Sequence, residues 1–332
     1  MSTEDEVYVF VKGSGDSKSL LSGIKLAEDN GGVVLRNDAE VSSAKDVVGF
    51  DVDKFFSALS TDGLGRTLLA SKRLSSTHSL VSKSFETLPI GTVCISRIQY
   101  SGRGRGGNTW DSPEGCLMFS LSLRWVDGRT LPLLQYVLSL AVVQAIEDMA
   151  KERGTSLPQV ALKWPNDIFL GGLKVGGVLC TSSYRNRAFD VTVGIGLNVN
   201  NAHPTTCINA ALQAACPSAA PVSHEALLAA LLNRLHSLLS VFEQQGFKPL
   251  EADYLQRWLH SGQHVVLEEA KEGGSVTQVS LTIQGLTTGG YLLATDPSGI
   301  QYELSPDGNS LDFFKGLMRR KLNPEEQVAG GH

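Results

Sequence analysis

The sequence predicts an α+β protein, in which a large domain of strands and helices is followed by a small β-rich domain. Two observations support this class. Between residues 65 and 260, short strand-like runs alternate with long helical runs. Between 261 and 322, strand-like runs follow one another across glycine-containing turns, which is typical of a small β-barrel. We expect residues 1–64 to form a separate N-terminal region of unknown role and residues 323–332 to form a polar, flexible tail.

The N-terminal region contains few predicted elements. Val7–Lys12 and Gly32–Arg36 resemble short strands, and Asp51–Leu59 resembles a helix. Two closely spaced helices with a basic recognition face are missing from this pattern. We therefore predict no helix-turn-helix and no DNA-binding domain.

The large domain combines β-rich segments with two kinds of helix. Leu133–Glu152 is apolar at helical spacing and long enough for a buried helix. Ser223 is a suitable N-cap for a helix through Gln245, and Gly246 is suited to end it. A last helix is expected at Leu250–Leu259. The expected strands are Thr67–Leu74, Gly91–Gln99, Cys116–Trp125, Val160–Lys163, Ile168–Leu170, Lys174–Ser182 and Phe189–Asn198.

The small domain is expected to be built from strands joined by tight turns. Turn signals lie at Gly273-Gly274, at Gly289-Gly290 and at Pro297-Ser298-Gly299. The expected strands are His264–Glu268, Val276–Gln284, Tyr291–Thr295 and Ile300–Leu304.

Composition narrows the class of partner. The net charge of −5 argues against nucleic acid as the main partner, because duplex binding usually needs a basic excess. The five cysteines are odd in number and lack C-x-x-C spacing, so we expect buried thiols in a reducing compartment rather than disulfides, a zinc site or a catalytic thiol. The acidic N-terminus resembles no targeting segment, and no apolar run reaches about 18 residues. We expect a cytoplasmic protein that does not enter a membrane.

The segment Gln99–Trp110 is the most informative one. A glycine-rich loop after a strand can turn backbone N–H groups toward one anion, and Arg103 and Arg105 add forked donors for phosphate or carboxylate. Trp110 offers a flat face for a base or ring. The loop also matches G-x-G-x-x-G, but a turn-like sequence follows where a dinucleotide fold needs a helix, so we reject that interpretation. An RGG-type RNA segment and a merely solvated surface loop stay open.

Two further segments are ambiguous when each is taken alone. Lys163–Ile168 (Lys-Trp-Pro-Asn-Asp-Ile) contains a turn, and Lys174 follows it in a strand beside glycines. Lys174 is either a surface residue with a buried stem or a cation held inside a site. In Val193–Asn200, glycines alternate within a strand, which indicates close approach by a ligand or simply tight packing.

Together, and in this order, the motifs resemble those of the biotin–protein ligases, also called holocarboxylase synthetases. The resemblance covers residues 65–320 and is closest to the plant enzymes, through the sequences at 73–78 and 306–310. The motifs are Ser76-Thr77, Gly102-Arg103-Gly104-Arg105, Lys163-Trp164-Pro165-Asn166-Asp167, Lys174-Val175-Gly176-Gly177 and Gly194-Ile195-Gly196-Leu197-Asn198.

The resemblance implies a fold and an activity. The family's catalytic domain, here 65–260, is a mixed β-sheet with helices on one side, like that of class II aminoacyl-tRNA synthetases, and its C-terminal domain is an SH3-like β-barrel. Such enzymes form biotinyl-5'-AMP from biotin and ATP with Mg²⁺. They then transfer biotin to one lysine in the carrier domain of a biotin-dependent carboxylase.

The resemblance also implies site residues. The expected catalytic residues are Lys174, Arg105 and Asp167. The expected biotin contacts are Ser76, Thr77, His78, Gln99, Gly102, Arg103, Gly104, Arg105, Lys174 and Gly177. The expected ATP contacts are Arg103, Arg105, Trp110, Asn166, Lys174 and Asn198. Two positions depart from the family pattern, because many members have asparagine in place of His78 and bacterial members often have a basic residue in place of Gly106.

Three other functions are weighed against the ligase. A lipoate or octanoate enzyme of the same fold would lack the paired Gly-Arg-Gly-Arg and Lys-Trp-Pro-Asn-Asp motifs. A non-catalytic module would bind biotin or nucleotide without releasing pyrophosphate. A nucleic-acid binder is disfavoured by the net charge of −5 and by the missing recognition helix.

Overall fold

The computed structural model describes residues 5–12, 22–26, 33–37, 48–201, 203–270, 276–306, 309–312 and 315–320. Within it the chain forms two compact units. The first comprises Met1–Leu162 and Asn166–Leu250, and the second comprises Lys163–Pro165 and Glu251–His332. The predicted tail at 323–332 lies outside the described residues.

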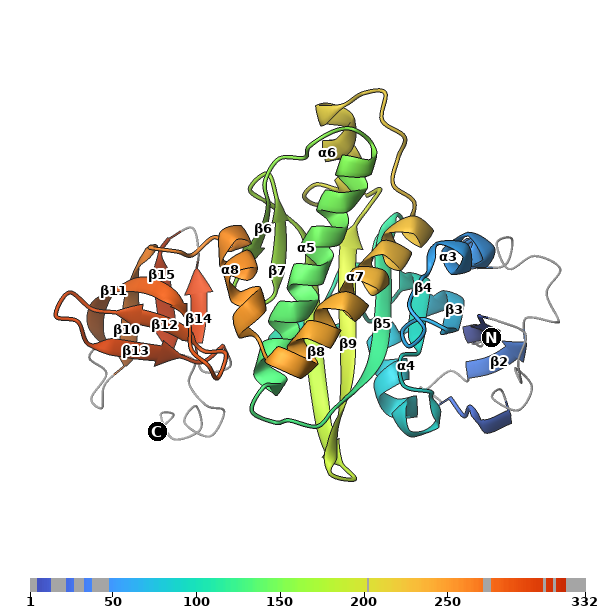
Figure 1. Ribbon diagram of the computed structural model, residues 1–332, viewed down its shortest axis with the longest axis horizontal. Helices are drawn as coiled ribbons and strands as arrows, with labels where there is room; N and C mark the ends of the chain where they lie inside the picture. Colours follow the sequence, from blue (N-terminus) through green and yellow to red (C-terminus); the bar gives the residue numbers. More distant parts are fainter. Residues whose placement is uncertain are drawn as a thin grey trace, which may run out of the picture. The chain divides into compact units, whose positions relative to one another are not determined.

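Among the described residues, nine strands form one mixed sheet in the order β2-β1-β3-β4-β5-β9-β8-β7-β6 (Figure 1). The pairs β1–β2 and β3–β4 are parallel, whereas β1–β3, β4–β5, β5–β9, β8–β9 and β7–β8 are antiparallel. The strands are β1 (Asp5–Val11), β2 (Val33–Asn37), β3 (Thr67–Leu74), β4 (Val93–Gln99), β5 (Cys116–Trp125), β6 (Val160–Lys163), β7 (Asp167–Leu170), β8 (Leu173–Arg185) and β9 (Ala188–Asn198).

The N-terminal region contributes two of these strands. β1 pairs with β3 along Tyr8 to Val11, opposite Ala70 to Thr67. The hydroxyl of Ser71 adds a bond of 2.6 Å to the backbone oxygen of Glu6. The sheet therefore continues across the region boundary that we predict near residue 64.

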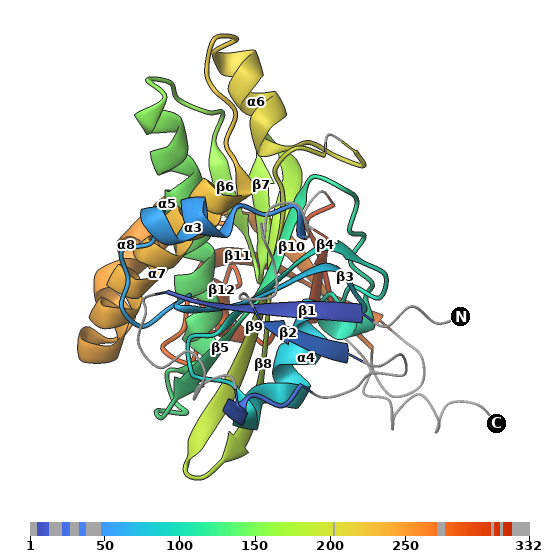
Figure 2. The same ribbon diagram turned by 90° about the vertical axis from the view of Figure 1, so that its right-hand side faces the viewer.

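Two long helices cover one side of the sheet. Figure 2 shows α5 (Leu134–Glu152) and α7 (His224–Gln245) on one side and the shorter α4 (Thr77–Ser84) on the other. α5 and α7 pack against each other, and most of α5 is buried, as its apolar sequence predicts. The shorter helices are α3 (Val52–Ala58), α6 (Ile208–Ala215) and α8 (Lys248–Arg257).

The ends of α7 follow the predicted capping chemistry. The Ser223 side chain accepts a bond from the backbone N–H of Ala226, and Gly246 adopts a φ of 72° just after the last helical residue. By length and composition, α7 and the segment Leu131–Glu152 are both apolar enough to cross a membrane. The second is mostly buried and α7 partly so, which is ordinary for the core helices of a folded domain.

The second unit is a curled sheet, as predicted for a small barrel. Its described strands lie in the order β13-β12-β11-β10-β15-β14. The alternating burial of β12 matches a sheet with one inward face. The strands are β10 (His264–Ala270), β11 (Val276–Leu286), β12 (Leu292–Thr295), β13 (Gln301–Leu304), β14 (Asn309–Asp312) and β15 (Leu317–Arg320). The predicted α+β class is therefore confirmed.

Among the α-helices and strands of the described residues, α4, α6, β14 and β15 were not expected from the sequence. The sequence of α4, Thr-His-Ser-Leu-Val-Ser-Lys-Ser, has little intrinsic helix preference. Its helix is set by the Ser76 N-cap and by burial of Leu80 and Val81 in a cluster with Leu69 and Cys94. Tertiary packing decides this segment, and local propensity does not.

Candidate functional site

Three glycines form a flat surface on the side of the sheet that α4 occupies. Gly177 of β8 pairs with Gly196 of β9, and Asp167 of β7 pairs with Gly177, so these residues share one row across the sheet. Gly194 lies two residues from Gly196 and faces the same side. We call Gly177, Gly194 and Gly196 the glycine floor.

Trp110 lies directly on this floor. A Cβ added to Gly196 would come within 2.6 Å of the Trp110 ring, and one added to Gly177 within 3.5 Å. Gly194 similarly makes room for His78, whose ring carbon would lie 3.2 Å from an added Cβ. The sequence left open whether these glycines mark close approach or tight packing, and here they admit two aromatic rings.

Lys174 also reaches this surface. Its Nζ lies 2.6 Å from Oδ1 of Asp167 and 5.4 Å from the centre of the Trp110 ring. Of the two side chains, Lys174 is 39% exposed and Asp167 is 18% exposed, so the ion pair is open to an incoming ligand.

A break in the strand register explains where Lys174 points. Ile168 pairs with Gly176, but Phe169 pairs with Lys174, which leaves Val175 as an extra residue in β8. Strict alternation would place Lys174 and Gly177 on opposite faces. The bulge at Val175 turns Lys174 to the face of the glycine floor.

The two predicted asparagines have structural partners. The side-chain N–H of Asn166 donates to the carbonyl of Val178 at 2.8 Å. The side chain of Asn198 donates to Thr205 at 3.2 Å, and Thr205 in turn donates to the backbone carbonyl of Lys174 at 2.6 Å. Thr205 joins Asn198 to Lys174, and it lies in none of the motifs from which the site was predicted.

The N-terminus of α4 forms a polar cluster with β4 and β5. The side-chain oxygen of Gln99 accepts from the backbone N–H of Thr77 at 2.7 Å and from its hydroxyl at 3.0 Å. The same hydroxyl lies 2.9 Å from that of Ser120. The hydroxyl of Ser76 caps α4 and is buried. Thr77 and Gln99, predicted to act together, are therefore in direct contact, and Ser120 is an addition to the set.

His78 is buried in this cluster, with 7% of it exposed. Burial lowers its pKa to about 4; the Thr192 backbone opposes this, and the charge of Arg103 adds to it. Its Nε2 lies 3.1 Å from the hydroxyl of Thr181. Its Nδ1 is buried and has no hydrogen-bond partner of normal geometry among the described residues. Such a group is suited to a polar atom of a ligand.

The segment between β4 and β5, residues 100–115, is called the glycine–arginine loop below. Arg103 and Thr109 form an isolated bridge, and the backbone N–H of Gly104 donates to Asn108 at 2.7 Å. The loop is thus a short hairpin, whose tip needs Gly106 at a φ of 67°. A Cβ on Gly102 would lie 2.5 Å from the carbonyl oxygen of Trp110, so the stem is closely packed.

The loop does not have the geometry of a dinucleotide site. Across residues 99–116, all of which are described, the only helical turn is the three-residue 3-10 segment Arg105–Gly107. A pyrophosphate site of the Rossmann type needs a full helix starting there. The rejection of that interpretation is confirmed.

Thiol chemistry is not indicated at Cys94, Cys116 or Cys180, and no candidate metal group is found in the described part of the chain. Burial raises the pKa of Cys116 and of Cys180 to about 12 and raises that of Cys94 further, so these three thiols stay neutral near pH 7. No group of three or more histidine, cysteine or acidic side chains among the described residues could hold a metal ion.

The Lys-Trp-Pro-Asn-Asp motif divides into two parts. Trp164 is 2% exposed, and its backbone N–H donates to Nε2 of His260 at 2.8 Å, within the second unit. Asn166 and Asp167 belong to the first unit, where Asp167 meets Lys174. The motif therefore combines a structural anchor, Trp164, with a predicted site residue, Asp167, and the sequence contained no signal for His260.

Comparison with known proteins shows the family to which the chain belongs. The model of the biotin/lipoate A/B protein ligase family matches residues 70–198. Biotin–protein ligase 2 of Arabidopsis thaliana is 50% identical over 296 residues, covering 89% of this chain and 90% of that protein. The chloroplastic biotin–protein ligase 1 of the same plant is 48% identical over 290 residues, covering 87% of this chain and 79% of that protein.

A solved structure shares the fold. The biotin protein ligase from Aquifex aeolicus, in complex with biotin and ATP, aligns with a TM-score of 0.56 at 27% identity. The alignment covers 70% of this chain and 93% of that protein. The stretch matched by the family model, residues 70–198, contains the glycine floor, the glycine–arginine loop, Lys174 and Asp167.

Proposed function

Because the chain belongs to the plant-type biotin–protein ligases, we propose that its site first joins biotin to AMP and then passes biotin to a protein lysine. Its activity is ATP-dependent biotin–protein ligation. The observation that carries the assignment of the site is the meeting of Lys174, Asp167 and Trp110 on the glycine floor. A cation, a carboxylate and a flat ring there suit a reaction between a carboxylate and a nucleotide.

The polar cluster at α4 is the proposed site for the biotin head. The ureido ring of biotin offers two N–H donors and one carbonyl acceptor. Ser76, Thr77 and Gln99 present short hydroxyl and amide groups, which can satisfy both kinds of atom. Nδ1 of His78, which is buried and has no hydrogen-bond partner of normal geometry among the described residues, supplies a further polar atom for the ring.

Lys174 is the proposed catalytic cation of the first step. A carboxylate oxygen of biotin attacks the α-phosphorus of ATP, a new P–O bond forms, and the bond to pyrophosphate breaks. Negative charge concentrates where the two anions meet, so a fixed ammonium stabilises the transition state more than the separate reactants. Asp167 holds Lys174 at 2.6 Å before substrates arrive, and the phosphates then compete for the same cation.

Mg²⁺ is proposed to arrive with ATP. Magnesium is commonly bound by one or two carboxylates together with substrate phosphates. Asp167 is the carboxylate next to Lys174, and it fits this limited role because the described residues offer no larger acidic cluster. The ion would offset phosphate charge.

The second step needs little beyond positioning. The acceptor lysine amine attacks the biotinyl carbonyl, AMP leaves with the electrons of the C–O bond, and the amine loses a proton. Once Lys174 turns to the phosphates, Asp167 is the nearest carboxylate to orient that amine or take the proton. Because the adenylate is already activated, holding the two reactants together supplies much of the rate.

The remaining predicted residues are proposed to bind the nucleotide and the intermediate. Arg103 and Arg105 lie in the same hairpin as Trp110, and their guanidinium groups can retain the adenylate. Trp110 would cover the adenine, and Gly177 gives it room to lie flat. Asn166 and Asn198 would contact the nucleotide from the ends of β7 and β9. Gly102 and Gly104 shape the hairpin stem.

We propose carrier domains of biotin-dependent carboxylases as acceptors, with neither nucleic acid nor membrane as a partner. We propose the cytoplasm as the place of action. One relative is named as chloroplastic, so an organellar form is the alternative. The location of the full-length protein fused to a fluorescent protein would decide between the two.

The test is transfer of labelled biotin to a biotin carboxyl carrier domain, with and without ATP. ATP-dependent labelling of one lysine, and none in a carrier whose acceptor lysine is replaced by arginine, is the expected result. Transfer of lipoate or octanoate in place of biotin would instead assign the chain to the lipoate branch. Biotin binding without pyrophosphate release would identify a non-catalytic binding module.

A further inference from the structure

The N-terminal region contacts both ends of the glycine–arginine loop. At the start of the loop the contact is direct, and at its end the contact runs through Arg97 of β4. Its described residues include β1 and the stretch 48–51 just before α3. None of them belongs to the glycine floor or to the polar cluster at α4. Their contacts with the loop are therefore the feature that links them to the site.

The first contact lies where the loop leaves β4. The hydroxyl of Tyr100 donates to a carboxylate oxygen of Asp5 at 2.8 Å, and the Arg73 guanidinium lies 4.9 Å from the centre of the Tyr100 ring. The bond to Asp5 is the main reason why the pKa of Tyr100 is raised. The backbone N–H of Ser101 donates to Ser75, just before the α4 cap. Tyr100 thus joins the start of the loop to the start of β1.

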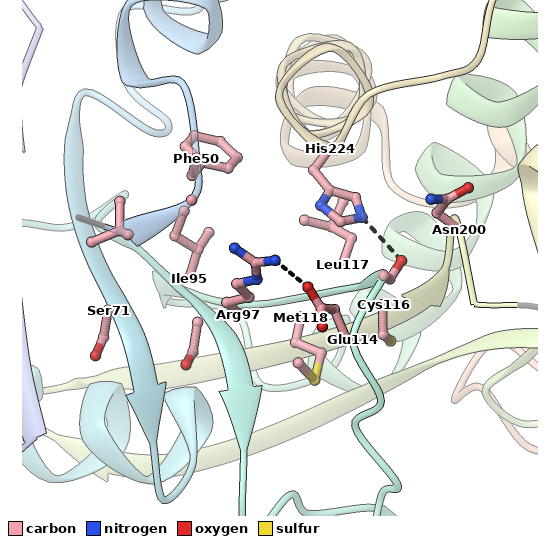
Figure 3. A pocket seen from close by; sticks show the side chains of 14 residues that line it. Phe50, Ser71, Ile95, Arg97, Glu114, Cys116, Leu117, Met118, Asn200 and His224 are labelled. Atoms are coloured by element: carbon pink, nitrogen blue, oxygen red, sulfur yellow. Dashed lines mark hydrogen bonds and ion pairs between the residues drawn. The ribbon is translucent and has the colours of Figure 1, made fainter. Parts of the chain in front are cut away.

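The second contact lies where the loop enters β5 (Figure 3). Glu114 forms an ion pair with Arg97 of β4. The Arg97 side chain in turn lies over Gly49, where an added Cβ would come within 2.6 Å of its terminal nitrogen. Gly49 has a φ of 69°, so an alanine there would be strained in addition to crowding Arg97.

The same end is fixed to the start of α7. The carbonyl of Gly115 accepts from the backbone N–H of Asn200 at 2.9 Å and lies 3.0 Å from Nε2 of His224. The backbone N–H of Asp51 donates to Glu225 of the same helix turn at 3.0 Å. The N-terminal region and the end of the loop therefore share one anchoring point, with Gly49 and His224 among the residues that line the pocket in Figure 3.

We propose that the N-terminal region is a positioning element for the glycine–arginine loop, in which the Asp5–Tyr100 bond fixes one end and the packing of Gly49 on Arg97, the ion-pair partner of Glu114, fixes the other. Holding both ends reduces the conformations open to the hairpin between them. A loop with fewer open conformations closes over its ligand at lower entropic cost. If the chain forms biotinyl-5'-AMP as we propose above, the expected consequence is firmer retention of this adenylate in the site.

The first test compares two tyrosines, Tyr100 and Tyr8, whose hydroxyls each donate to a carboxylate. Tyr100→Phe removes the bond to Asp5 but keeps the ring beside Arg73. Tyr8→Phe removes a similar bond, to Glu6 at 3.0 Å, in β1 itself, and serves as the control. Trypsin cleavage after Arg103 or Arg105, followed by mass spectrometry on the full chain, reports how open the hairpin is. We expect cleavage about three- to tenfold faster in Tyr100→Phe and unchanged in Tyr8→Phe.

The second test alters the other end of the loop. Gly49→Ala should also accelerate cleavage after Arg103, and so should Asp5→Ala. In turnover, each of these variants should release more adenylate, seen as labelling of bystander lysines. The melting temperature should stay unchanged in Tyr100→Phe and Asp5→Ala, which lose one exposed hydrogen bond, and should fall in Gly49→Ala, where the new side chain is strained. A loss of thermal stability in Gly49→Ala would leave Tyr100→Phe and Asp5→Ala as the deciding variants.

Wild-type cleavage rates in Tyr100→Phe and Asp5→Ala would overturn the proposal. Because cleavage needs neither biotin nor ATP, that outcome is distinct from a failure of the proposed function. The latter would appear as absent biotin transfer in the unmodified chain, whatever the cleavage rates are.

Discussion

The two faces of strand β9 differ in the size and polarity of their side chains. On the face covered by α5 and α7, the four side chains between residues 191 and 197 are apolar and no more than 3% exposed. On the other face, Gly194 and Gly196 carry no side chain, and Asn198 is polar but buried. The apolar residues are Val191, Val193, Ile195 and Leu197.

This difference teaches that the two faces serve different partners. The apolar face is filled by the protein's own helices, and its residues contribute stability through burial. The glycine face keeps space for two rings, Trp110 and His78, and for what they will contact. Substitutions on the first face should therefore change stability, and substitutions on the second should change activity at nearly constant stability.

Lys174→Ala should give the largest effect on the glycine face. Removing the cation where two anions meet should lower biotin-dependent pyrophosphate release by about 100- to 1,000-fold. The fold should persist, because the Lys174 side chain is 39% exposed and an ion pair with such a partner contributes little to stability. Lys54→Ala, at an exposed lysine of α3, is the control and should keep full activity. Normal turnover in Lys174→Ala would remove its catalytic role.

Two glycine substitutions on opposite faces should separate activity from stability. In Gly196→Ala the new Cβ meets the Trp110 ring at 2.6 Å, which can shift with its loop, so we expect about 100-fold lower activity and a nearly unchanged melting temperature. In Gly176→Ala the new Cβ overlaps Leu197 and lies 2.7 Å from the backbone oxygen of Gly196, which cannot shift. That variant should lose about 1–3 kcal/mol of stability.

Both variants are measured by thermal unfolding and by pyrophosphate release. If Gly196→Ala unfolds as easily as Gly176→Ala, the two faces do not differ in the way that we infer.

Arg105→Gly should give a smaller effect. We expect it to weaken retention of the adenylate and to leave the rate of adenylate formation nearly unchanged. A charge-assisted contact to the adenylate would be lost, so escape of the adenylate should rise about tenfold. Labelling of bystander lysines, measured by mass spectrometry, reports this escape. Arg129→Gly is the control, because Arg129 is a 90% exposed loop arginine paired with Asp127. Unchanged target selectivity in Arg105→Gly would contradict the proposed role.

The sequence predicted those parts of the fold that depend on local chemistry. The strands of the large domain, the caps of α7 and the apolar helix α5 follow from periodicity and capping residues, and the structure confirms them. The motifs also named Lys174 and Asp167, which lie together. These features need only neighbouring residues to be specified.

The features that the sequence did not predict depend on pairing and packing between segments, over separations from five residues (Phe169 to Lys174) to 96 residues (Trp164 to His260). The bulge at Val175 is set by pairing with β7, and without it Lys174 would point to the opposite face. α4 forms because its apolar residues meet β3 and β4. The bond between Trp164 and His260 spans 96 residues. Periodicity within a segment contains no information about such partners.

The two histidines that are buried among the described residues, His78 and His260, should give the smallest effect, a dependence of stability on pH. Burial lowers the pKa of His78 and of His260 to about 4, against about 6.5 in an unfolded chain. Between pH 6.5 and pH 4 the unfolded chain therefore binds more protons, and stability falls as the pH falls. We expect a loss of about 1 kcal/mol per histidine at pH 5.5, measured by urea unfolding, with no further loss from these groups below about pH 4.

The histidines differ in their partners, and this should separate their variants. Nε2 of His260 accepts from Trp164, and Nδ1 lies 2.8 Å from the side-chain oxygen of Gln263, so both nitrogens are satisfied by protein. His260→Gln should destabilise the chain at pH 7 and weaken the pH dependence. His78→Gln should weaken the pH dependence equally but mainly reduce biotin affinity, because Nδ1 of His78 has no bond of normal geometry among the described residues to lose. Equal loss of stability at pH 7 in both variants would mean that His78 is held by the protein itself and is not reserved for a ligand.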